Sequence, residues 1–170
     1  KDLLAYLRVL TNPDDDSAFL RIVNTPRREI GPATLQKLGE WANLRNKSLF
    51  NASFDVGLGQ TLSGRGLEHL QRFTHWLQEI VQMTEREPVN AVRDLIRGID
   101  YESWLFETSG SPKAAEMRMK NVNTLFQWMT EMLEGSDIDE PMTLTQVVTR
   151  FTLRDMMERG ESDEELDQVQ

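Results

Sequence analysis

Residues 67–81, LEHLQRFTHWLQEIV, decide the fold class of this chain. Apolar side chains recur in this stretch at steps of three and four residues, the spacing that places them on one face of an α-helix. They are Leu67, Leu70, Phe73, Leu77, Ile80 and Val81. Polar and charged residues fill most of the other positions. The stretch therefore predicts an amphipathic helix that buries one face.

The same periodicity extends along the chain in both directions. It predicts further helices over 3–10, 14–23, 32–42, 48–54, 88–98, 111–134 and 143–160, with Gly160 ending the last of them. Four glycines mark a loop around Ser63, and Asp100 is expected to cap a short turn over 101–106. No segment alternates apolar and polar residues as a strand would. We therefore predict an all-α, compact multi-helix domain.

Length and composition exclude several classes of protein. The 170 residues suit one domain, and the absence of cysteine excludes disulfides, thiolate metal sites and a cysteine nucleophile. No apolar run approaches the roughly 20 residues needed to cross a bilayer. We expect no membrane contact and a cytoplasmic location.

The net charge of −9 is unevenly distributed along the chain. Residues 131–170 carry 3 basic and 12 acidic side chains, whereas residues 1–130 carry 16 of each. Residues 21–50 have six basic side chains against two acidic ones. Since charges act on a phosphate only within about 8 Å at physiological salt, a small basic patch can function on an acidic protein.

That basic patch contains a turn at residues 24–35, NTPRREIGPATL. Pro26 ends the preceding helix and Pro32 suits the first position of the next one. Between them, Gly31 predicts a positive φ or a closely approached backbone. The segment therefore reads as a helix end, a basic turn and a helix start, in the manner of a helix-turn-helix.

Arg27 and Arg28 precede the new helix start directly. A helix N-terminus offers unpaired N–H groups and a partial positive charge, and phosphate is the natural ligand for that combination. An ordinary turn between two helices, with two solvated arginines, explains the same residues. Both interpretations stay open on this segment alone.

Four stretches of the chain resemble the 2B subdomain of bacterial Rep/UvrD-type helicases of superfamily 1A. They are residues 2–16, 24–35, 101–105 and 142–151. In that family the turn is usually Gly-Ile-Gly-x-x-Thr and holds duplex DNA by its backbone. Ile30, Gly31 and Thr34 fit this pattern, while Glu29 stands at the first glycine position.

The resemblance implies that residues 1–170 are a single helical subdomain of a larger ATP-dependent 3′–5′ DNA helicase, with the acidic segment 161–170 near a hinge. It implies a non-catalytic, regulatory piece that contacts duplex DNA at a single-strand/double-strand junction and restrains unwinding by rotation. ATP and magnesium are expected only in the motor domains of the parent. The residues assigned to the duplex backbone site are Thr25, Arg27, Arg28, Ile30, Gly31, Ala33, Thr34 and Lys37.

The search for chemistry within the chain is otherwise negative. No Gly-x-x-x-x-Gly-Lys-Ser/Thr loop is present, and His69 and His75 lie six residues apart, on different faces of the predicted helix. The run Asp14–Asp16 is interpreted as a solvated helix start, since consecutive helix residues point about 100° apart. We therefore predict no catalytic, cofactor or metal site in this segment.

A protein-interaction module is the alternative interpretation. In that case the acidic segment 131–167 docks a basic partner or the other subdomains of the parent, and the basic turn is incidental. Apolar residues of the last helices that stay exposed would favour this alternative.

Overall fold

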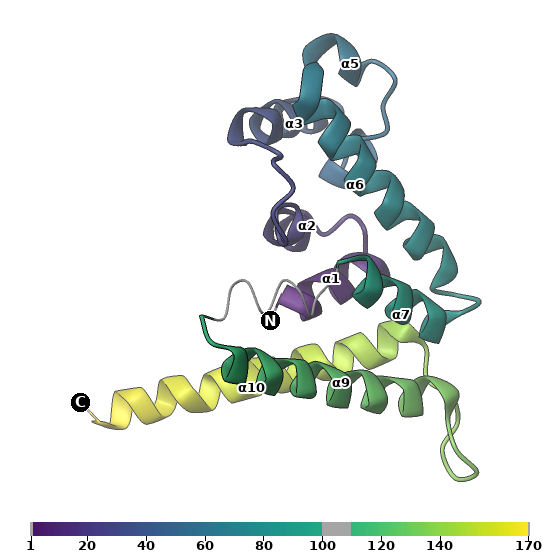
Figure 1. The fold of residues 1–170 in the computed structure, drawn as a ribbon, viewed down its shortest axis with the longest axis vertical. Coiled ribbons are helices and arrows are strands. Elements are labelled where there is room, and N and C mark those ends of the chain that lie inside the picture. The colour runs from purple at the N-terminus through teal and green to yellow at the C-terminus, as the bar shows by residue number, and fades with distance from the viewer. Residues whose placement is uncertain (1, 100–109, 170) are drawn as a thin grey trace.

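The computed structural model describes residues 2–99 and 110–169, with side chains as far as Glu161. Their secondary structure is helical throughout, with no strand in the described ranges, so the all-α prediction is confirmed (Figure 1). The helices are α1 (Asp2–Thr11), α2 (Asp16–Ile22), α3 (Pro32–Leu44), α4 (Leu49–Ala52), α5 (Leu58–Thr61), α6 (Gly64–Met83), α7 (Pro88–Gly98), α9 (Pro112–Glu134) and α10 (Leu144–Val169). None of these helices is long and apolar enough to cross a membrane.

Helix boundaries follow local capping signals. The Asp15 side chain accepts a hydrogen bond from the Ala18 N–H at 3.1 Å and caps α2, and Ser111 does the same for α9 through the Ala114 N–H at 3.2 Å. Gly135 ends α9 with φ +76°, a conformation that glycine adopts at little cost.

Helix α1 is the centre of the arrangement and packs against α2, α6 and α10 (Figure 1). Helices α9 and α10 lie side by side beneath it, and α7 connects α6 to this pair. Helices α3 and α5 gather at the opposite end, around the start of α6. The fold therefore places the turn between α2 and α3 well away from α9 and α10.

Helix α6 confirms the periodicity that predicted it. Leu70, Phe73, Leu77 and Ile80 are buried in the common core, while Leu67 and Val81 pack against its edge. Thr74 is also buried, and its hydroxyl donates to the Gln71 carbonyl at 3.4 Å. The helix thus joins the α1–α2 layer to the α3–α5 end through one continuous apolar face.

The end of α10 and the loop before α6 differ from their predictions. Gly160 does not end the last helix, because α10 continues to Val169 and carries the acidic segment with it. A helix of 26 residues absorbs the cost of about 1 kcal/mol for one glycine. The loop predicted around Ser63 contains the short helix α5. The turn predicted at 101–106, with its cap at Asp100, lies outside the described residues.

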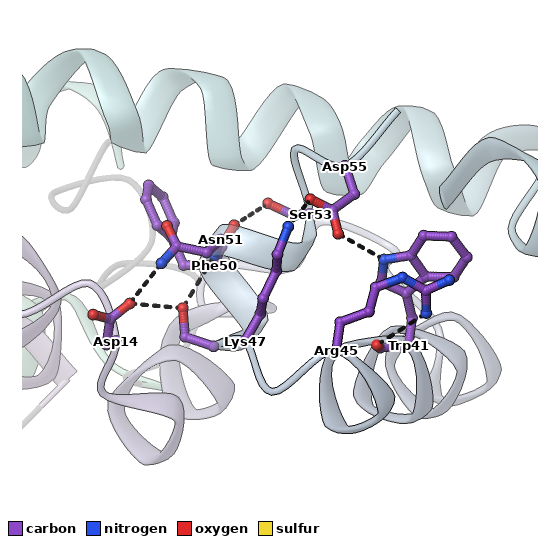
Figure 2. Close-up of polar contacts among 9 residues, drawn as sticks. Asp14, Trp41, Arg45, Lys47, Phe50, Asn51, Ser53 and Asp55 are labelled. Atoms are coloured by element: carbon purple, nitrogen blue, oxygen red, sulfur yellow. Dashed lines mark hydrogen bonds and ion pairs between the residues drawn. The ribbon is translucent and has the colours of Figure 1, made fainter. Parts of the chain in front are cut away.

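The prediction that Asp14–Asp16 form a helix start is confirmed, since Asp15 caps α2 and Asp16 is its first residue. Asp14 and Asp16 are exposed, and their carboxylates also bond to the start of α4, as Figure 2 shows for Asp14. The Asp14 carboxylate accepts from the Ser48 hydroxyl at 2.7 Å and from the Asn51 amide at 2.9 Å. The Asp16 carboxylate accepts from the Leu49 N–H at 2.9 Å. These bonds fasten the start of α4 to the start of α2.

A second polar contact joins the end of α3 to the segment after α4 (Figure 2). The Asp55 carboxylate accepts from the Lys47 ammonium at 2.7 Å and from the Trp41 indole N–H at 2.9 Å. These two hydrogen bonds lower the pKa of Asp55 below its usual value. Gly57 completes the contact, because a Cβ there would lie 2.8 Å from the Trp41 ring.

Candidate nucleic-acid interface

The segment between α2 and α3 is anchored by Asn24 and Ile30. The Asn24 side chain accepts from the Ile30 N–H at 3.0 Å and donates to the Ile30 carbonyl at 2.7 Å. The Ile30 side chain is 1 % exposed and belongs to the core. The Ile30 N–H is therefore occupied, and this residue shapes the turn from within.

Arg28 holds the same turn from the other side. Its Nη1 donates to the carbonyls of Ile22, Val23 and Thr25 at 2.7, 3.2 and 3.2 Å, at and just after the end of α2. Its Nη2 donates to the Tyr6 hydroxyl, which in turn donates to the Thr25 carbonyl. Both terminal nitrogens of the guanidinium are thus engaged inside the protein.

Aromatic rings surround the Arg28 guanidinium. The Arg28 Cζ atom lies 4.3 Å from the centroid of the Phe73 ring. Its distances to the ring centroids of Tyr6 and Trp76 are 5.8 and 5.9 Å. Burial raises the pKa of Tyr6 and outweighs the neighbouring positive charge, which acts in the opposite direction. Arg28 is therefore a positioning residue for the turn.

The positive φ in this turn belongs to Glu29, at +60°. Gly31 has φ −70° and ψ 162°, and a Cβ added there would meet nothing within 4 Å. The prediction that Gly31 supplies a positive φ or a tight approach is therefore wrong. The left-handed residue lies two positions earlier, where the family pattern has its first glycine.

The start of α3 offers three N–H groups without an acceptor in the described parts of the chain. They belong to Gly31, Ala33 and Thr34, and Pro32 between them has no N–H to offer. The open space around Gly31 leaves room for a ligand to approach them. Unpaired donors at the positive end of a 13-residue helix suit an anion.

The remaining predicted residues divide into exposed and structural ones. Arg27 and Lys37 are exposed, and neither makes an ion pair with any residue that the structure describes. Thr25 is structural, because its hydroxyl donates to the Arg21 carbonyl at 3.2 Å and its own carbonyl accepts from Tyr6. The structure thus brings Arg27 and the three N–H groups into one region and turns Arg28 and Ile30 inward.

Helix α6 contributes residues that the sequence search did not assign to the site. Its start lies against the start of α3, since a Cβ on Gly66 would fall 2.3 Å from the Thr34 hydroxyl oxygen. The His69 Nδ1 atom lies 3.4 Å from the Glu29 carbonyl oxygen. Arg65 is exposed beside this junction. The missed signal was the polar face of the helix that the apolar periodicity had already defined.

A cavity of about 440 Å³ opens next to the turn. The turn and helices α6 and α7 line it, through Arg27, Arg28, Glu29, His69, Arg72, Phe73, Trp76 and Gly98. No group of three or more metal-ligating side chains occurs among the described residues. The cavity is lined mainly by cationic and aromatic side chains, together with one exposed carboxylate, that of Glu29.

The sequence of the chain is similar to those of several known proteins. The chain is 84% identical over all 170 residues to the "ATP-dependent DNA helicase Rep" of Escherichia coli and covers 25% of that protein. It is 40% identical over 170 residues to the protein of the same name from Buchnera aphidicola, covering 26% of it. It is 28% identical to "DNA helicase II" of Escherichia coli, covering 23%. The chain thus spans about a quarter of the length of the relatives that it matches.

The resemblance to Rep/UvrD-type helicases is confirmed by these identities and by a family match over the whole chain. The matched family is described as the UvrD-like helicase C-terminal domain, and the match covers residues 1–170. The chain therefore belongs to the family of the UvrD-like helicase C-terminal domain.

Proposed function

We propose that this chain is the 2B subdomain of an ATP-dependent 3′–5′ DNA helicase of the cytoplasm, and that it holds the backbone of duplex DNA at a single-strand/double-strand junction. The observation that carries the proposal is the start of α3. Three N–H groups there, at Gly31, Ala33 and Thr34, have no acceptor among the described residues, and they lie in the same turn as Arg27, which makes no ion pair with any of those residues. Such donors bind phosphate and do not read bases, so no sequence preference is expected.

The packing around the turn supports a rigid contact. Arg28 and Asn24 fix the turn by hydrogen bonds to its backbone, and Ile30 anchors it in the core. A phosphate bound at α3 is therefore coupled to the body of the domain, so that hinge rotation of the domain moves or blocks the duplex as a unit. This is how the segment restrains unwinding in our proposal, while ATP and magnesium act in the motor parts of the parent.

The relatives' names support the choice of parent. Proteins called "ATP-dependent DNA helicase Rep" match over the whole of this chain. Because the chain spans only a quarter of their length, the helicase activity of the parent is part of the proposal and not of the segment itself.

The proposal is tested by fluorescence anisotropy of labelled duplex and single-stranded DNA, titrated at several salt concentrations. We expect duplex-preferring binding whose salt slope falls by about two, or about 0.9 for each phosphate contact, in the double variant Arg27→Met/Lys37→Met. Arg86→Met serves as the control, because Arg86 is exposed beyond the far end of α6. An unchanged slope in the double variant would remove the turn from the interface.

Restraint of unwinding is tested in the full-length parent carrying the same double substitution. We expect a changed rate of duplex unwinding with unchanged ATP hydrolysis on single-stranded DNA, since the motor sites lie elsewhere. A parallel change in both rates would contradict a regulatory role.

A second candidate function rests on the apolar surface of α9 and α10. Trp128, Leu153, Met156 and Met157 are 43%, 56%, 61% and 68% exposed. Exposed large apolar side chains gathered on two neighbouring helices are typical of an interaction surface. This observation favours docking on the other subdomains of the parent, in addition to or in place of a role in DNA binding.

The docking role is tested by mixing this chain with the remainder of the parent and measuring association by ultracentrifugation. Met156→Glu with Met157→Glu should weaken that association about tenfold or more, since burying an unpaired charge at an interface is costly. Val56→Glu is the control, because Val56 is fully exposed on the loop between α4 and α5. Equal weakening by the control would argue against this surface.

A further inference from the structure

One face of α6 carries Arg65, His69, Arg72 and Trp76. Their spacing of four, three and four residues places them in a single row along the helix. At about 1.5 Å per residue the row runs roughly 16 Å from its first to its last member. It begins beside the three unpaired N–H groups at the start of α3 and leads to the cavity near α7.

Cationic and aromatic side chains line most of the cavity at the end of this row, and the exposed carboxylate of Glu29 also lines it. Arg27 and Arg72 are exposed at its sides, and no ion pair with another described residue engages either of them. Trp76 and Phe73 supply aromatic surface, with their ring centroids 6.1 Å apart. The volume of about 440 Å³ lies within the range of small-molecule sites.

The position of the Trp76 ring is fixed by its neighbours. A Cβ on Gly98 would lie 2.5 Å from the ring, so only glycine allows α7 to approach this closely. On another side the ring meets Tyr6 in a T-shaped contact with centroids 6.5 Å apart. Trp76 nevertheless stays partly exposed, and it lines the cavity.

Free guanidinium groups beside a fixed, partly exposed indole match the two halves of a nucleotide. Guanidinium binds phosphate, and an aromatic face stacks on a base of any identity. The bases of a duplex are paired and stacked inside it, so a base that reaches Trp76 must come from an unpaired strand. The geometry points to a binding site for one unpaired nucleotide, its phosphate at Arg72 and its base on Trp76.

This site deepens the proposed function, on which its placement next to a duplex rests. The start of α3 holds the duplex side of a junction, and the cavity takes the first nucleotide of the single-stranded side. The domain then recognises the junction itself and not merely the duplex.

Anisotropy titrations with four labelled probes test this inference. The probes are a blunt duplex, the same duplex with a dT₄ overhang, the same overhang with abasic sites, and single-stranded dT₈. We expect the dT₄ overhang to raise affinity about fivefold or more over the blunt duplex, the smallest effect of stacking one base on an aromatic side chain. The abasic overhang should give a clearly smaller gain.

Variants separate the site from the rest of the interface. Arg72→Gln and Trp76→Leu should each remove the gain in affinity from the overhang and leave binding of the blunt duplex unchanged. Trp76→Phe, which keeps an aromatic ring, should retain most of that gain. Arg86→Gln is the matched control on the surface beyond the far end of α6. Arg72 is exposed, so its variant remains informative if Trp76→Leu fails to fold.

The outcomes distinguish this site from the proposed function. If the blunt duplex binds and the overhang adds nothing, the nucleotide site is refuted and the duplex site stands. If the blunt duplex does not bind while dT₈ binds in a manner that depends on Arg72, the duplex site is refuted and the nucleotide site stands. If neither probe binds, both are refuted.

Discussion

Substituting Arg27 and Arg28 separately by methionine should affect different properties, although the two residues are adjacent and alike. Arg28→Met should lower stability, and Arg27→Met should weaken duplex binding. Arg27 is exposed at the turn without an ion pair among the described residues, whereas Arg28 donates to three carbonyls and to Tyr6. Methionine removes the charge and the donors in both cases and keeps an unbranched stem of similar reach.

The expected magnitude for Arg28→Met follows from its contacts. One hydrogen bond to Tyr6 and one shared among the carbonyls, at about 1.5 kcal/mol each for a charged donor, give roughly 3 kcal/mol. The cation–π contact with Phe73 adds about 0.5–1 kcal/mol, which new apolar contacts of the methionine largely offset. A loss of about 3 kcal/mol corresponds to a fall in Tm of roughly 6–12 °C for a domain of this size.

Arg27→Met should change stability by less than about 0.5 kcal/mol, as surface substitutions usually do. It should instead lower the salt slope of duplex binding by about 0.9, the contribution of one phosphate. Thermal unfolding followed by circular dichroism and anisotropy titrations measure the two effects. A Tm for Arg28→Met within about 2 °C of that of the unsubstituted chain would refute the structural role given to Arg28.

Three further predictions concern single positions. Glu29→Gly relieves about 1 kcal/mol of left-handed backbone strain, partly offset by the entropy of glycine in the unfolded state, so urea titrations should show equal or higher stability. It also removes a negative charge beside the phosphate site, so anisotropy should show tighter duplex binding. Gly98→Ala places a methyl group against the Trp76 ring and should cost about 1–3 kcal/mol in the same urea titrations. The pKa of Asp55 is lowered chiefly by the Lys47 hydrogen bond, so the stabilisation from its carboxylate is present above the unfolded pKa of about 3.9 and is lost as pH falls through the folded value. The stability difference between the unsubstituted chain and Asp55→Asn should therefore be constant above about pH 5 and shrink below about pH 4. A difference that grows on acidification would contradict this prediction.

The roles within the candidate site were only partly predictable from the sequence. The sequence placed the turn at residues 24–35 and singled out its arginines, because glycine, proline and charge patterns are local signals. It could not separate Arg27 from Arg28, since the partner of Arg28, Tyr6, lies 22 residues away in α1. It also assigned the unusual φ to Gly31, whereas the structure has it at Glu29.

Most of the helices were determined by the sequence alone, because their hydrogen bonds and side-chain faces repeat within four residues, as the buried face of α6 and the Ser111 cap show. The exceptions are the short helix α5 and the end of α10. The site was decided by the tertiary structure, because it is assembled across long separations. The contact between His69 and Glu29 spans 40 residues, and Gly98 meets Trp76 across the junction of α6 and α7. Apolar periodicity shows which face of a helix is buried but not what its polar face will contact. Packing therefore determines which polar faces meet.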